Sequence, residues 1–201
     1  MNSTNKVVLG LTGYYCSGKS AVEKIIAENY NFLTIDVDKL GHEVLEEKKD
    51  EIVYTFGSGI LEKSKISRKK LGQIVFSDKK KLRLLNSIVH PRMIDKVRGQ
   101  IEKNKNKPLC INAALLFDMN LDKLCNIIFI VKTNIWSILK RAKRRDGSSI
   151  FKTLRIINSQ KGIRSINKKK HFADISYIGN NKKIELLKEE IDRVLKEKKV
   201  I

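Results

Sequence analysis

The segment Gly13-Tyr14-Tyr15-Cys16-Ser17-Gly18-Lys19-Ser20 constrains the fold of this chain most, because it matches the phosphate-binding pattern G-x-x-x-x-G-K-[ST] at every fixed position. The apolar run Val7–Thr12 before it is typical of a buried strand, and Ala21–Ala27 after it is typical of the start of an amphipathic helix. This order of strand, loop and helix is the context that the motif requires. An ordinary glycine-rich turn is the alternative, but the composition of the chain gives only about 0.01 accidental matches.

The motif predicts a site for a nucleoside triphosphate. Backbone N–H groups of the loop would surround the phosphates, and the positive end of the helix dipole would add to their attraction. Lys19 would reach the β- and γ-phosphates, and the Ser20 hydroxyl would ligate Mg²⁺. Three bulky residues stand where small ones let the backbone approach phosphate most easily, and we interpret them as tolerated because their side chains can point outward. The loop residues assigned to the nucleotide are Gly13, Tyr14, Tyr15, Cys16, Ser17, Gly18, Lys19 and Ser20.

The composition suits one compact α/β domain with insertions, since the chain has 201 residues of which 41% are hydrophobic. No apolar run approaches the roughly 20 residues that a membrane-spanning helix needs, and the short polar segment Met1–Lys6 is not expected to be a signal peptide. The three cysteines, Cys16, Cys110 and Cys125, lie far apart and form no Cys/His cluster. The sequence therefore predicts no zinc site, reduced thiols, a cytoplasmic location and no membrane partner.

The formal net charge of +20 has two interpretations. It is compatible with a nucleic-acid-binding surface, or with an evenly solvated basic surface that reflects compositional bias. The lysines are spread along the chain, and no zinc-finger or aromatic RNA-binding signature accompanies them. We favour the solvated surface and expect no nucleic-acid partner.

Strand-like and helical segments alternate along the chain, which predicts a parallel sheet with helices on both faces. The helical stretch from 39 to about 104 is broken near 57–59 and 64–67. Farther along, Pro91 is expected to start a new helix, Met93–Glu102. The further expected strands are Asn31–Ile35, Pro108–Asp118, Asn126–Val131 and Asp174–Ile178. We expect a single domain over 1–201, with a core of about 1–38, 105–133 and 173–201, a substrate-holding helical insertion of about 39–104 and a lid of about 134–172.

Acidic side chains follow two of the expected strands. Ligands of open α/β sheets bind at the carboxyl ends of strands, so Asp36 and Asp118 should lie near the phosphate loop. Phosphoryl transfer needs a carboxylate that takes the proton of the acceptor hydroxyl, and Asp36 is placed for this role. If the chain stays extended, the Asp38 side chain would point to the same side as that of Asp36. Alternatively, Asp38 would cap a helix starting near Lys39.

A second charged group lies in the expected lid. Arg141 and Arg145 are four residues apart and therefore share one face of a helix. They would close over the phosphates and stabilise negative charge in the transition state. A solvated basic face is the alternative.

Taken together, these residues resemble the dephospho-coenzyme A kinases, P-loop enzymes that phosphorylate the ribose 3′-hydroxyl of dephospho-coenzyme A. The resemblance runs from about Leu9 to Asn180. Its motifs are Leu11-Thr12-Gly13 with Ser17-Gly18-Lys19-Ser20, Ile35-Asp36-Val37-Asp38, Arg68-Lys69-Lys70-Leu71, Leu85-Asn86-Ser87-Ile88-Val89-His90-Pro91, the series Arg141, Arg145 and Gln160, and Ala173-Asp174 with Asn180. The chain departs from the family at Tyr14-Tyr15-Cys16, which replaces Gly-Ile-Gly, and at Asp118, which replaces a glutamate.

The resemblance implies a three-layer P-loop kinase fold, ATP and Mg²⁺ as cofactors, and dephospho-coenzyme A as the substrate. A monomer is expected, with an oligomer left open. The implied roles are catalysis for Asp36, Lys19 and Arg141, ATP binding for Arg145 and Asn180, and substrate binding for Asp36, His42, Arg68, His90 and Asp118. Fixing the turn before Pro91 is an equal alternative for His90. Two rival functions stay open: a P-loop kinase for a nucleoside, nucleotide or sugar, and a nucleic-acid-binding ATPase.

Overall fold

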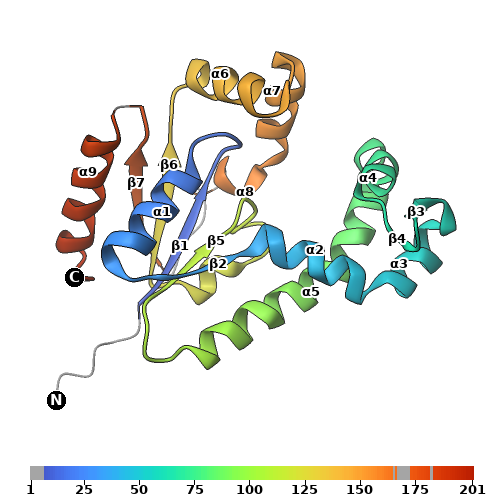
Figure 1. Cartoon of the computed structure of the whole chain (residues 1–201), viewed down its shortest axis with the longest axis horizontal. Helices are drawn as coiled ribbons and strands as arrows, with labels where there is room; N and C mark the ends of the chain where they lie inside the picture. Colours follow the sequence, from blue (N-terminus) through green and yellow to red (C-terminus); the bar gives the residue numbers. More distant parts are fainter. Residues whose placement is uncertain (1–6, 165, 167–172, 182) are drawn as a thin grey trace. The chain divides into compact units, whose positions relative to one another are not determined.

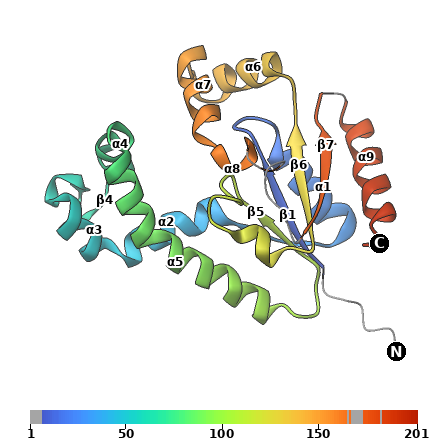
Figure 2. The same ribbon diagram turned by 180° about the vertical axis from the view of Figure 1, so that it is seen from behind.

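The structure is a computed structural model that describes residues 7–201 except 165, 167–172 and 182 (Figure 1). The chain divides into two compact units. The first runs up to Asp36 and resumes at Ile101, and the second is Val37–Gln100. A five-stranded sheet forms the centre of the first unit, and the second unit is helical with one short hairpin (Figure 2).

The sheet has the strand order β2-β5-β1-β6-β7, and every neighbouring pair is parallel. Its strands are β1 (Val8–Gly13), β2 (Leu33–Asp36), β5 (Leu109–Asn112), β6 (Ile127–Lys132) and β7 (Asp174–Gly179). All six residues of β1 are buried, as continuous apolar runs in parallel sheets require. Because the strands are parallel, all their carboxyl ends lie at one edge, and the phosphate loop follows β1 there.

Two helices cover one face of the sheet. The helices α1 (Lys19–Tyr30) and α9 (Ile184–Glu197) lie beside each other against it (Figure 1). Leu11 of β1, Ile26 of α1 and Ile191 of α9 are completely buried in their common core. Burial of each such side chain contributes about 1.5–3 kcal/mol to the free energy of folding. This core therefore fixes β1 and α1, the two elements between which the phosphate loop lies.

On the opposite face of the sheet, Gly10 of β1 lies against the segment that follows β5. A Cβ atom on Gly10 would lie 2.9 Å from Cys125 Sγ and 3.0 Å from a methyl group of Leu116. The missing side chain therefore lets the segment after β5, which includes the 3₁₀ helix η2 (Leu121–Leu124), pack directly on β1.

The helical hairpin of the first unit consists of α6 (Ile135–Asp146) and α7 (Ile150–Ser159), followed by the short α8 (Lys161–Arg164). Asn134 caps α6 by accepting a hydrogen bond of 2.7 Å from the Ser137 N–H. Gly147, with a φ of 62°, ends α6 directly after Asp146. These signals set the two ends of α6, and Figure 1 shows α6 and α7 above the carboxyl ends of the strands.

The second unit consists of α2 (Val37–Glu47), α3 (Lys49–Phe56), the 3₁₀ helix η1 (Ser58–Ile60), the hairpin β3 (Leu61–Glu62) and β4 (Lys65–Ile66), α4 (Arg68–Ser77) and α5 (Lys79–Lys103). Ion pairs join α2 to α5 within the unit: Lys96 lies 3.0 Å from Glu43, and Arg92 lies 3.0 Å from Glu47. Within the described ranges, no helix combines the length and the apolar character that crossing a membrane requires.

The predicted α/β fold with a central parallel sheet is confirmed, but two local predictions are wrong. Pro91 does not start a helix and lies inside α5, where it removes one backbone hydrogen bond. The helix continues because Leu85, Val89, Met93 and Val97, spaced four residues apart, are all buried on either side of the proline.

The strand expected to run from Pro108 to Asp118 ends at Asn112. Beyond it the chain turns back on itself, with the Leu121 N–H donating to the Leu116 carbonyl at 2.9 Å. Leu116 and Leu121 are completely buried, so this turn packs apolar side chains under the sheet instead of extending it. Asp118 therefore lies in the turn and not at a strand end.

Candidate active site

The phosphate loop connects β1 to α1 through a tight turn. The Ser17 N–H donates to the Tyr14 carbonyl at 2.9 Å, and Cys16 and Gly18 take positive φ angles of 56° and 96°. A Cβ atom on Gly18 would lie 1.9 Å from Asn180 Nδ2, so this position requires glycine for both conformation and space.

Two side chains, one from α6 and one that directly follows β7, hold the loop at Ser17. Arg141 Nη1 and Asn180 Nδ2 each donate to the Ser17 carbonyl at 2.9 Å, and Arg141 Nη2 donates to the Asn180 carbonyl at 3.0 Å. In a trans peptide the following N–H points opposite to the carbonyl. Holding the Ser17 carbonyl therefore turns the Gly18 N–H away from Arg141, as an anion nest requires.

Gln160 fixes the other half of the loop. Its Oε1 accepts from the Tyr15 N–H at 2.9 Å, and its Nε2 lies 3.3 Å from the Gly13 carbonyl and 3.2 Å from the Ala114 carbonyl. The side chain is only 4% exposed. Gln160 thus ties both the loop and the segment after β5 to the end of α7.

The two polar residues that follow Gly18 stand at the start of α1. Lys19 Nζ lies 3.4 Å from the Gly13 carbonyl across the loop, and Ser20 is exposed. The Ser20 hydroxyl is the hard oxygen donor that Mg²⁺ prefers. No group of three or more His, Cys, Asp or Glu side chains suited to a metal occurs in the described part of the chain. The residues fit a Mg²⁺ ion whose shell is completed by phosphates and water, as is usual for Mg²⁺ in kinases.

Asp36 is the last residue of β2 and is half-buried. It lies opposite Asn112 of β5, which lies opposite Leu11 of β1, so two strand spacings, about 10 Å, separate Asp36 from β1. The Asn112 amide donates to the Glu23 carboxylate of α1 at 2.8 Å. Sequence reasoning missed this pair, although an asparagine that ends an apolar strand was a usable signal.

Asp38 fills neither of its two predicted roles. The helix α2 begins at Val37, directly after Asp36, so the chain does not stay extended and Asp38 lies in the first turn of the helix. There its carboxylate stabilises the positive end of the helix dipole.

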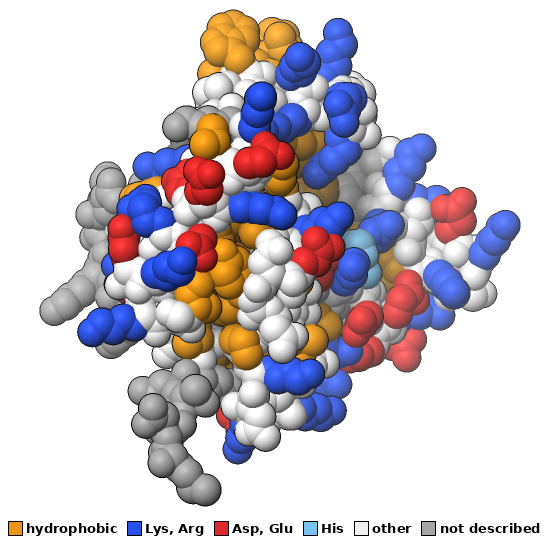
Figure 3. All heavy atoms as spheres, turned by 60° about the vertical axis from the view of Figure 1, so that its left-hand side comes forward, with side chains coloured by type: hydrophobic (Ala, Val, Ile, Leu, Met, Phe, Trp, Pro, Cys, Tyr) orange, Lys and Arg blue, Asp and Glu red, His pale blue; other side chains and the backbone are white. Residues whose placement is uncertain are grey.

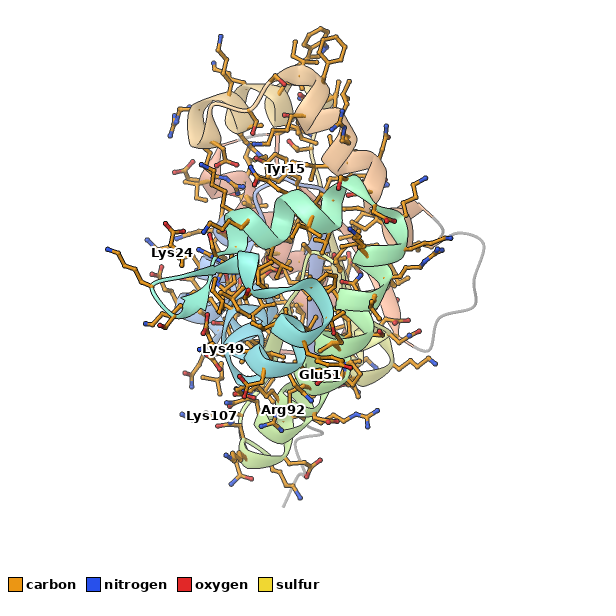
Figure 4. The ribbon with its side chains drawn as sticks, turned by 90° about the vertical axis from the view of Figure 1, so that its right-hand side faces the viewer. Tyr15, Lys24, Lys49, Glu51, Arg92 and Lys107 are labelled. Atoms are coloured by element: carbon orange, nitrogen blue, oxygen red, sulfur yellow. The ribbon has the colours of Figure 1, made fainter. Side chains whose placement is uncertain are left out.

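Arg145 forms the second charged group together with a residue that sequence reasoning missed. Its Nε and Nη2 donate to the two carboxylate oxygens of Asp146 at 2.8 and 3.0 Å. Its guanidinium carbon lies 4.8 Å from the centre of the Tyr15 ring, and the Tyr15 hydroxyl donates to the same carboxylate. Tyr15 therefore points towards α6 and is not an outward-facing substitution (Figure 4).

The contacts among Tyr15, Arg145 and Asp146 shift the pKa values of Asp146 and Tyr15. The hydrogen bonds from Arg145 and Tyr15 lower the pKa of Asp146 to about 2. Burial, together with the hydrogen bond to Asp146, raises the pKa of Tyr15 above its usual value. At neutral pH the group is therefore a carboxylate, a guanidinium and a neutral phenol.

The remaining predicted site residues divide between the two units. In the second unit, Arg68 Nη1 lies 2.6 Å from His42 Nε2, and both side chains are exposed. His90 is half-buried within α5, so the alternative that it fixes a turn before Pro91 is wrong. In the first unit, Asp118 lies against Gly162 of α8, where an added Cβ would approach its Oδ2 to 2.9 Å.

Comparison with known proteins gives one consistent result. The family model described as dephospho-CoA kinase matches residues 7–185. A dephospho-CoA kinase of Borreliella burgdorferi is 41% identical, covering 94% of this chain and 93% of its own. A dephospho-CoA kinase of Fusobacterium nucleatum is 38% identical, covering 93% of this chain and 96% of its own.

Solved structures agree in fold. Dephospho-CoA kinase from Campylobacter jejuni has a TM-score of 0.61 at 27% identity and covers 96% of this chain and 97% of its own. Shikimate kinase from Acinetobacter baumannii, at a TM-score of 0.52 and 17% identity, covers 97% and 96% and shares the fold alone. The predicted P-loop kinase fold is confirmed. The family match over nearly the whole chain shows that this protein belongs to the dephospho-CoA kinase family.

Proposed function

We propose that this protein transfers the γ-phosphoryl group of ATP to the ribose 3′-hydroxyl of dephospho-CoA, giving ADP and coenzyme A. The observation that carries the proposal is the family match over residues 7–185, which includes both the sheet unit and the helical unit Val37–Gln100. A kinase for another small acceptor, or an ATPase driven by nucleic acid, would not be expected to match over both units.

Asp36 is the proposed general base. Its half-buried carboxylate ends β2 at the same edge of the sheet as the phosphate loop. It would accept the proton of the 3′-hydroxyl while the hydroxyl oxygen forms a bond to the γ-phosphorus. The bond from that phosphorus to the bridging oxygen breaks, and the electron pair leaves with ADP.

The positive charge that this step needs would come from the loop and from α6. Lys19 would leave its bond to the Gly13 carbonyl and contact the β- and γ-phosphates. Ser20 would ligate Mg²⁺, which when bound neutralises charge on the phosphates. Arg141 would act from behind the loop, since it donates to the Ser17 and Asn180 carbonyls, and Arg145 would contact the phosphates directly.

We assign the unit Val37–Gln100 to the coenzyme substrate, with His42, Arg68 and His90 as contacts, and Asp118 as a contact from the sheet unit. Asn180 stays assigned to the adenine end of ATP, although its side chain amide is also bonded to the loop. The enzyme is proposed to work in the cytoplasm, where the thiols of Cys16, Cys110 and Cys125 would stay reduced, and to act as a monomer, with an oligomer as the alternative.

The test is acceptor-dependent ADP release by the purified protein with Mg-ATP. Dephospho-CoA, adenosine, AMP and shikimate are compared at equal concentration, with buffer as the background. Turnover with dephospho-CoA alone is the expected result. Turnover with another acceptor and not with dephospho-CoA would support kinase activity but contradict dephospho-CoA as the substrate.

A further inference from the structure

Tyr15 makes more contacts than a loop residue beside a phosphate site needs. Its backbone N–H donates to Gln160 at 2.9 Å, its hydroxyl donates to Asp146, and its ring faces the Arg145 guanidinium at 4.8 Å. The Ser148 hydroxyl lies 3.4 Å from the Tyr15 hydroxyl. Backbone, hydroxyl and ring thus all connect the phosphate loop to α6 and the segments that follow it.

The carboxylate of Asp146 fixes the orientation of Arg145. Two parallel N–H···O bonds, of 2.8 and 3.0 Å, set the plane of the guanidinium. They engage two of the five N–H groups that a guanidinium carries. The other three are directed away from Asp146 and are available in geometry to a bidentate anion such as phosphate.

Arg145 and Asp146 are the last two residues of α6, so the bonds between them fix the pair within that helix. Tyr15 belongs to the phosphate loop, and it binds the carboxylate of the pair through its hydroxyl and the guanidinium through its ring face. The guanidinium is therefore held at a fixed place relative to the loop.

We propose that Tyr15 is a positioning residue for nucleotide binding, which acts through Asp146 to hold the Arg145 guanidinium at the phosphate loop before ATP arrives. This inference rests on the proposed contact between Arg145 and the ATP phosphates. A long side chain that is already ordered loses less freedom when it binds, and removing that order should weaken ATP binding by about 3- to 10-fold.

The first test compares Tyr15→Phe with a matched control. Tyr15→Phe retains the ring and removes the hydroxyl that binds Asp146. The control Tyr30→Phe removes another tyrosine–aspartate bond of this unit, from Tyr30 to Asp192 at 3.2 Å between α1 and α9. Binding of the non-hydrolysable analogue AMP-PNP with Mg²⁺ is measured by calorimetry without acceptor.

Tyr15→Phe is expected to raise the Kd about 3- to 10-fold and the KM for ATP in parallel, with little change in kcat at saturating ATP. Tyr30→Phe should leave the Kd unchanged. Thermal melting of both variants shows whether any loss of AMP-PNP affinity comes from unfolding of the protein. An unchanged Kd in Tyr15→Phe, or an equal rise in Tyr30→Phe, would overturn the proposal.

The second test places Tyr15→Phe in an Arg145→Ala background. Arg145→Ala alone should weaken AMP-PNP binding, and adding Tyr15→Phe should weaken it no further, because the hydroxyl acts only through Arg145. Additive losses would show that Tyr15 acts by another route. If Arg145→Ala binds AMP-PNP as tightly as the unchanged protein, the proposed contact between Arg145 and the phosphates is wrong, and so is this inference. The proposed acceptor is tested separately, by ADP release with dephospho-CoA.

Discussion

Asp36 is the residue on which the proposed chemistry depends, and the chain changes conformation directly after it. The strand β2 ends at Asp36 and α2 begins at Val37, so Asp36 and Asp38 belong to different elements although only Val37 lies between them. The sequence identified Asp36 because it follows an apolar run, but the Asp-x-Asp spacing alone did not indicate which residue starts the helix.

Replacing Asp36 with Asn retains the shape of the side chain and removes its proton affinity. We expect turnover to fall by about 10²- to 10⁴-fold, the usual contribution of a general base, while the Kd for ATP changes less than about twofold. Steady-state kinetics and calorimetry measure the two effects. Asp38→Asn, in the first turn of α2, is the control and should retain turnover. Near-normal turnover of Asp36→Asn would show that the base is another group.

The three cysteines differ in environment, and this difference predicts their reactivity. Burial raises the pKa of Cys110 well above its usual value and that of Cys125 to about 12, so both are neutral thiols at pH 8. Cys16 lies half-exposed in the phosphate loop. Iodoacetamide at pH 8 should therefore modify the folded protein at Cys16 alone, as read by peptide mass spectrometry. Rapid modification of Cys110 or Cys125 before the protein unfolds in urea would contradict this.

At the scale of elements, β1, α1 and β6 were predictable because long apolar runs and a phosphate-loop motif mark them. The hairpin of β3 and β4 was not, since each strand has only two residues and its turn rests on positive φ angles at Lys63 and Ser64, which no glycine signals. The continuation of α5 past Pro91 was missed because tertiary burial outweighs the lost hydrogen bond.

The same contrast applies to the site. The loop and Asp36 were read from local sequence, whereas the partners that hold them are distant in the chain. Asp146 lies 131 residues from Tyr15, and Gln160 lies 145 residues from it. The resemblance marked Gln160 as a family position, but nothing local in the sequence showed which loop atoms it binds.

Two helical glycines of the second unit offer a matched pair of variants. A Cβ on Gly99 of α5 meets nothing within 4 Å, whereas one on Gly41 of α2 would lie 3.2 Å from the Met93 side chain. Gly99→Ala should stabilise the protein by about 0.5–1 kcal/mol, because alanine costs less backbone entropy in a helix. Gly41→Ala should increase stability less, because its Cβ would crowd the Met93 side chain. Urea unfolding measures both, and a loss of stability in Gly99→Ala would contradict the helical conformation at this position.

At the scale of the whole molecule, the net charge of +20 needs an account that agrees with the family. On the face shown in Figure 3, Lys and Arg side chains are scattered with acidic and apolar side chains between them. Such a surface binds polyanions only through nonspecific contacts that salt screens.

We therefore expect no nucleic-acid-dependent activity. Single-stranded RNA or duplex DNA added at 150 mM salt should not increase ADP release in the absence of dephospho-CoA. Any retention on a polynucleotide at low salt should disappear as salt rises, with the steep slope of counterion release. Stimulation of ATP hydrolysis that persists at 150 mM salt would support a nucleic-acid function after all.

The central claim is that the phosphoryl group moves from ATP to the ribose 3′-oxygen of dephospho-CoA. The most direct measurement is phosphorus and proton NMR of the product made by the purified protein from Mg-ATP and dephospho-CoA. We predict one new phosphate coupled to the proton on the ribose 3′-carbon, formed in equal amount with ADP. A phosphate on any other oxygen, or ADP formed without a phosphorylated coenzyme, would contradict the account.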